Sequence, residues 1–108
     1  MSDRFMKYDE VNGLNGNITL SAENNVYEKV FNDEYEYIKI NMLRSFASTG
    51  LAKLKLYINE AKEDEAILLD SLISSYKFEE IGIRKIRLVL DTTDDINATQ
   101  EVSIILMR

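Results

Sequence analysis

The pattern of polar and apolar residues changes its period twice between Lys53 and Leu90, and this stretch constrains the fold more than any other part of the chain. Residues 53–58 (Lys-Leu-Lys-Leu-Tyr-Ile) alternate strictly, and residues 83–90 (Ile-Arg-Lys-Ile-Arg-Leu-Val-Leu) alternate again. Between them, one helical stripe collects the apolar residues Ala61, Leu68, Leu69, Leu72, Ile73 and Tyr76. A period of 2 is typical of a strand and a period of about 3.6 of an amphipathic helix, so the stretch predicts strand, helix, strand.

The predicted helix covers residues 60–77. Asn59 suits its N-cap, and its first turns carry the acidic residues Glu60, Glu63, Asp64 and Glu65, where the helix dipole stabilises negative charge. An alternative interpretation places two strands here, at 66–70 and 71–78, with 60–65 as a hairpin loop. The serines at positions 71, 74 and 75 favour the strands because serine is a poor helix former, whereas the lack of a period-2 apolar face favours the helix.

Alternation also predicts four other strands, at residues 17–22, 26–31, 35–43 and 101–108. The first three are separated by short polar turns, Asn24-Asn25 and Asn32-Asp33-Glu34, which is typical of an antiparallel meander. We therefore expect a single domain over residues 1–108 with an α+β fold. Its antiparallel-rich sheet has about six strands, and one helix covers the even-residue face. If the two-strand interpretation holds, the fold is instead an all-β sandwich or jelly roll.

The composition argues against an enzyme. The 108 residues include no cysteine and no histidine, which removes the commonest general base and the usual ligands of zinc, copper and iron. We expect no catalytic residues and no cofactor. The net charge of −6 disfavours duplex nucleic acid as a partner. Because the chain contains neither a long apolar run nor a recognisable secretory signal, we expect it in the cytoplasm or in an assembly made there.

The acidic loop Asp91–Asn97 has oxygen-bearing side chains at alternate positions, as an EF-hand calcium loop does. However, Ile96 stands where that loop requires glycine, and Val102 where it requires a bidentate glutamate. The sequence therefore predicts a solvated turn here and no metal site.

Aromatic and basic residues share the odd-numbered positions of the predicted strands, which face solvent if the even-numbered positions face the core. The candidate binding residues are Tyr27, Lys29, Tyr37, Lys39, Lys53, Lys55, Tyr57, Lys85 and Arg87. If these strands are neighbours, an acidic protein carries one locally basic and aromatic sheet face. Such a face suits an acidic protein partner or single-stranded nucleic acid, although Lys, Arg and Tyr are also typical of an ordinary solvated strand.

We therefore expect a non-enzymatic protein-binding module, such as an inhibitor, an immunity protein or an assembly factor. It would act through the basic and aromatic sheet face or through the acidic start of the helix. Further apolar residues at odd positions, namely Phe31, Val89, Ile105 and Met107, indicate that another protein or a second copy covers part of this face. Two alternatives remain open. One is a structural subunit of a larger assembly such as a virion or surface array, and the other is a single-stranded nucleic-acid binder.

Overall fold

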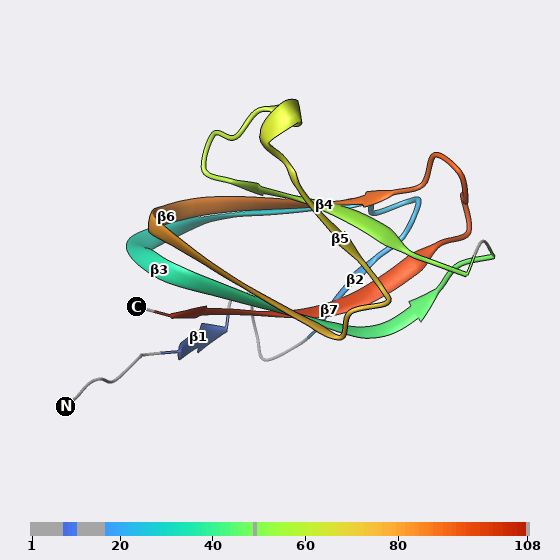
Figure 1. Cartoon of the computed structure of the whole chain (residues 1–108), viewed down its shortest axis with the longest axis horizontal. Coiled ribbons are helices and arrows are strands. Elements are labelled where there is room, and N and C mark those ends of the chain that lie inside the picture. Colours follow the sequence, from blue (N-terminus) through green and yellow to red (C-terminus); the bar gives the residue numbers. More distant parts are fainter. Residues whose placement is uncertain (1–7, 11–16, 49, 108) are drawn as a thin grey trace.

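The chain is almost entirely antiparallel β-sheet in a computed structural model that describes residues 8–10, 17–48 and 50–107 (Figure 1). Strands make up 67% of the described residues, which contain no α-helix. The strands are β1 (Tyr8–Glu10), β2 (Ile18–Leu20), β3 (Val26–Phe46), β4 (Lys53–Ile58), β5 (Ile67–Asp70), β6 (Ser75–Asp91) and β7 (Thr99–Met107). The one helical element described is a 3-10 turn, η1 (Glu63–Glu65).

The predicted helix at 60–77 is therefore wrong, and so is the α+β fold class; the all-β alternative fits the structure better. This region forms a loop containing η1, then β5, a turn at 71–74 and the start of β6. Pairing of β5 with β4 provides the backbone hydrogen bonds that a helix would have formed internally. The apolar stripe does not face a core, because Leu68 and Leu72 are 72% and 80% exposed whereas Leu69 is buried.

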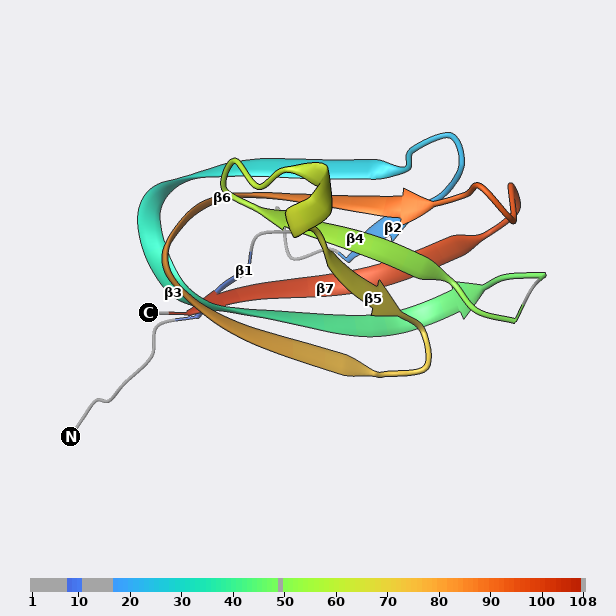
Figure 2. The same cartoon turned by 45° about the horizontal axis from the view of Figure 1, so that its top comes forward.

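The seven strands of the described residues form one sheet in the order β1-β7-β3-β6-β4-β5, with β2 also paired to β7. The long strands β3 and β6 bend together, so the sheet folds over into two layers (Figures 1 and 2). Layer A contains residues 35–46 of β3 and 75–83 of β6, together with β7 and the short strands β1 and β2. Layer B contains residues 26–30 of β3 and 85–91 of β6, together with β4 and β5.

The bend changes which residues of β3 face the core. The pairing of β3 with β6 shifts register between Val30 and Tyr35 and again between Tyr35 and Tyr37. After the bend, even-numbered residues such as Ile38 are buried, as predicted, but before it Val30 is 66% exposed. The predicted turn at residues 32–34 is also wrong, because β3 continues through it. A β-bulge turns the strand here and reverses its faces.

The even-numbered core prediction is confirmed for β4, the second half of β6 and β7. The buried side chains there include Leu54, Leu56, Ile58, Ile86, Leu88, Leu90, Val102, Ile104 and Leu106. These residues fill the space between the two layers. In the part of the chain that the structure describes, no helix has the length and apolar character needed to cross a membrane.

Asn59 stabilises the junction between β4 and β6, although it caps no helix. Its backbone adopts a φ of 57°, a left-handed conformation that Asn tolerates better than most residues. Its side-chain Oδ1 accepts hydrogen bonds from the backbone N–H groups of Arg84 (2.8 Å) and Lys85 (3.2 Å). Its Nδ2 donates to the carbonyl oxygen of Gly82 at 2.9 Å. Gly82 itself has a φ of 78°, so the bulge of β6 and Asn59 hold one another in place.

Candidate protein-interaction surface

Five of the predicted binding residues come together on the outer face of layer B. They are Lys53, Lys55, Tyr57, Lys85 and Arg87. Strand pairing aligns the outward side chains in rows that cross the layer. From β3 towards β5, three of these rows are Asp91, Lys53 and Asp70; Val26, Val89, Lys55 and Leu68; and Glu28, Arg87 and Tyr57. The registers of three strand pairs therefore place these five residues side by side.

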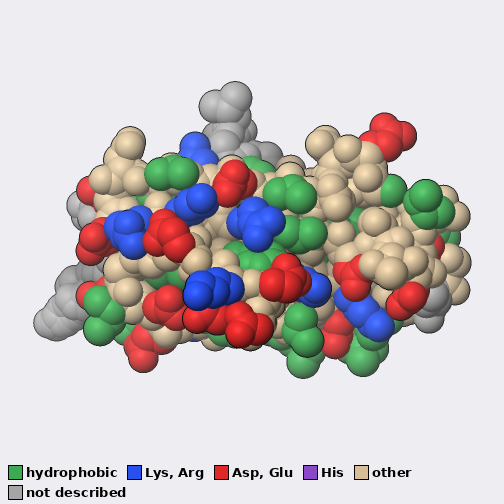
Figure 3. All heavy atoms as spheres, turned by 90° about the horizontal axis from the view of Figure 1, so that it is seen from above, with side chains coloured by type: hydrophobic (Ala, Val, Ile, Leu, Met, Phe, Trp, Pro, Cys, Tyr) green, Lys and Arg blue, Asp and Glu red, His purple; other side chains and the backbone are tan. Residues whose placement is uncertain are grey.

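Carboxylates from other elements neutralise this basic group. Lys55 Nζ lies 2.7 Å from Glu63 Oε2, and Lys85 Nζ lies 3.2 Å from Glu28 Oε2. On this face the four cations Lys53, Lys55, Lys85 and Arg87 are matched by the four carboxylates Glu28, Glu63, Asp70 and Asp91. Figure 3 shows Lys and Arg side chains interspersed with Asp and Glu side chains over this surface. The face therefore carries no net positive field that would attract an anionic partner.

Tyr57 is nearly buried at the centre of this face. The guanidinium carbon of Arg87 lies 4.1 Å from the centre of its ring, and its hydroxyl donates a 2.7 Å hydrogen bond to Glu63 Oε1. That hydrogen bond raises the pKa of Tyr57. In return, hydrogen bonds from Lys55 and then Tyr57 lower the pKa of Glu63. Glu63 therefore occupies the position that a partner's carboxylate or phosphate would take between Lys55 and Tyr57.

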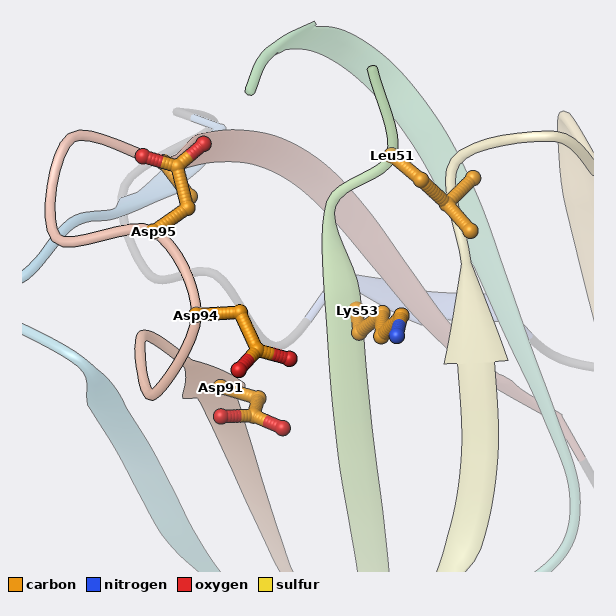
Figure 4. Close-up of a pocket in the computed structure, with 6 residues that line it drawn as sticks. Leu51, Lys53, Asp91, Asp94 and Asp95 are labelled. Atoms are coloured by element: carbon orange, nitrogen blue, oxygen red, sulfur yellow. The ribbon is translucent and has the colours of Figure 1, made fainter. Parts of the chain in front are cut away.

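A depression of about 180 Å³ adjoins Lys53. It is lined by Leu51, Lys53, Asp91, Asp94, Asp95 and Ala98, and Figure 4 shows the Asp91 and Asp94 carboxylates pointing towards β4. The nearly buried Asp95 accepts hydrogen bonds from the N–H groups of Ser48 and Asn97. A hydrogen bond from the Thr93 N–H is the main cause of the lowered pKa of Asp91. Among the described residues, no group of three or more His, Cys, Asp and Glu side chains is arranged to hold a metal ion.

The other four predicted residues lie elsewhere, so the prediction of one continuous face is wrong. Tyr27 packs against the core, and this burial raises its pKa. Lys29 is exposed but pairs with the buried Ile86, on the same side of the strand as Tyr27. Tyr37 and Lys39 belong to layer A, where Lys39 lies directly opposite Lys77 of β6. The bulge in β3 is the cause, because it reverses the faces of the strand between Lys29 and Tyr37.

Exposed apolar side chains are frequent in the segment that runs from β5 to the bend of β6. Nine large hydrophobic residues are exposed in the described chain, and four of them lie in this short stretch: Leu68, Leu72, Ile73 and Ile81. Ile81 is 88% exposed, the highest value of the nine. The predicted helix placed three of these four residues in its buried stripe, so their exposure was not predicted. Only the serines at 71, 74 and 75 indicated that a turn interrupts that stripe.

The same stretch borders a free strand edge. Residues 75–83 of β6 pair with β3 on one side, and β4 pairs only with residues 86–91 further along. In the chain as described, the other side of residues 75–83 therefore has no strand partner. An unpaired edge presents backbone N–H and C=O groups that another strand can bind.

Comparison of the chain with protein-family models, with curated protein sequences and with solved structures finds no match.

Proposed function

We propose that this protein is a non-enzymatic protein-binding module that takes an extended segment of its partner at the free edge of β6. The observation that carries the proposal is the unpaired side of residues 75–83. This stretch includes the exposed Ile81 and follows the exposed Leu72 and Ile73. In strand addition, backbone hydrogen bonds provide affinity and neighbouring side chains provide specificity. Exposed apolar groups beside such an edge add buried area when a partner docks.

The outer face of layer B supports a nucleic-acid function less well. Lys55 and Lys85 are held in ion pairs with Glu63 and Glu28, and Arg87 lies over the ring of Tyr57. A phosphate would have to displace these carboxylates and would meet Asp70 and Asp91 beside them. Binding of single-stranded nucleic acid requires cations that can neutralise the phosphate backbone, and here carboxylates of the same chain already neutralise most of them.

Affinity capture from cells of the native source tests the proposal. The double variant L72S/I81S removes two exposed apolar side chains beside the edge and leaves the core intact. The matched control is I96S, because Ile96 is similarly exposed but lies in the 92–98 loop. We expect the wild type and I96S to retain a partner that L72S/I81S loses. The partner should also slow amide hydrogen exchange at residues 75–81. Equal capture by all three proteins, or no protection of this edge, would contradict the proposal.

A further inference from the structure

The first half of β6 is complementary in charge to itself. We propose that the partner of this edge is a second copy of the chain, paired antiparallel about Phe78 so that Lys77 of one copy faces Glu79 of the other. This inference rests on the proposed function and names the occupant of the same edge. A two-fold axis makes every contact occur twice, so the interface contains two Lys77–Glu79 pairs.

Lys77 and Glu79 lie on the same side of the strand. In the pairing of β6 with β3, Lys77 lies opposite Lys39 and Glu79 lies opposite Tyr37. Phe78, between them, faces inward. Figure 2 shows this half of β6 as the lower rim of the molecule. A second strand added at this rim would meet both charges on the outer face of layer A. Opposite charges placed directly across a strand pair are stabilising, and like charges are destabilising.

Lys77 has no ion-pair partner among the described residues of its own copy. Its nearest cross-strand neighbour is another cation, Lys39, and its Nζ lies 5.1 Å from the centre of the Tyr37 ring. In the described residues, no ion pair involves either lysine. The Glu79 carboxylate of a second copy would therefore reduce an existing repulsion as well as form a new pair.

The same charges select one register. Pairing centred on Lys77 would place Lys77 opposite Lys77, and pairing centred on Glu79 would place two glutamates together. Only the register centred on Phe78 pairs unlike charges at both positions. Charges on an edge strand normally prevent self-association, but here they oppose the shifted registers and leave one favourable arrangement.

Apolar groups extend the contact on either side of the charges. In this register the Ser75 end of one strand lies beside Ile81 of the other copy, and Ile73 lies in the turn at 71–74 that precedes Ser75. The exposed Ile73 and Ile81 therefore lie on either side of the charged positions in each copy. On the inner side, Phe78 meets its own counterpart and extends the stack that it forms with Tyr76, whose ring centres are 6.0 Å apart. Because the paired edge is short, we expect a dimer of micromolar affinity.

Sedimentation equilibrium of the full chain over a range of concentrations tests this arrangement by charge exchange. The single variants K77E and E79K each place like charges opposite one another twice, so we expect the dimer to weaken by roughly 10- to 100-fold. The double variant K77E/E79K restores the unlike pairs and should recover wild-type affinity to within about threefold. Because both side chains are exposed, thermal unfolding of the three variants should match the wild type and exclude misfolding as the cause.

A wild type that remains monomeric at every concentration would overturn the inference, as would a double variant no better than the single ones. The proposed function would fail separately. If the wild type is monomeric but L72S/I81S still loses a captured partner, the edge binds a different protein. If charge exchange follows the expected pattern, the second copy is the occupant.

Discussion

Asn59 offers the most direct test of how β4 and β6 are held together. Replacement by alanine removes three side-chain hydrogen bonds, to the backbone of Gly82, Arg84 and Lys85. Each such bond contributes about 0.5–1.5 kcal/mol, and because Arg84 is exposed, water can replace part of the loss. The bonds therefore amount to about 2–3 kcal/mol. Alanine also resists the left-handed conformation at a φ of 57°, which adds about 1 kcal/mol. We expect N59A to lose about 3–4 kcal/mol of unfolding free energy.

Glycine at the same position separates the two contributions. N59G loses the hydrogen bonds but accepts the left-handed backbone, so its loss should be about 2–3 kcal/mol, less than that of N59A. Urea unfolding monitored by far-ultraviolet circular dichroism measures both variants. N32A serves as the control because Asn32 is exposed in β3, and it should stay within about 0.5 kcal/mol of the wild type. Wild-type stability in N59G, or a greater stability of N59A than of N59G, would refute the reasoning.

Two further predictions use the same unfolding assay. Leu56 is fully buried and Leu68 is exposed. L56A should therefore lose about 2–5 kcal/mol of unfolding free energy, and L68A less than about 0.5 kcal/mol. A large loss in L68A would support the helical interpretation instead. Hydrogen bonds from Lys55 and Tyr57 lower the pKa of Glu63 below its ordinary 4.5. The Glu63 carboxylate therefore adds to the unfolding free energy above pH 4.5, and this contribution is lost as the pH falls through the lowered pKa. E63Q should have a lower urea midpoint than the wild type at pH 7, and the two midpoints should converge in acid; a constant difference would argue against the interaction.

Several strands could be predicted from the sequence because their burial enforces strict alternation. Lys53–Ile58 has one face against the core and one towards solvent, so Leu54 and Leu56 identify the buried side directly. The strand at 99–107 follows the same rule, although its odd-numbered face is only partly exposed. Where a strand is straight and one of its faces is buried, local pattern and tertiary position agree.

The preferred helix at 60–77 was wrong, and the alternative loop at 60–65 with a strand at 66–70 fits better, because the apolar residues of this region do not all pack in the core. Leu69 is buried, but Leu68, Leu72 and Ile73 are exposed, and their spacing resembles a helical stripe only by coincidence. Such residues obscure the difference between a short strand with a turn and an amphipathic helix. Residues 67–70 form a strand because they pair with residues 53–56 of β4. The local sequence pattern of 60–77 contains no information about this pairing.

The prediction of one continuous binding face failed for a different physical reason, namely the bend of the two long strands. Counting odd and even positions assumes that a strand keeps one face throughout, but the bulge between Val30 and Tyr37 reverses that relation. Tyr27 consequently packs against the core while Tyr37 lies on the other layer. Charge adds a second effect, since the carboxylates that neutralise Lys55 and Lys85 come from Glu63 and Glu28 on other elements. A bent sheet assembles each outer face from several sequence-distant segments. The net charge of each outer face therefore depends on the strand registers and on the positions of the bulges. The composition of a single strand determines neither.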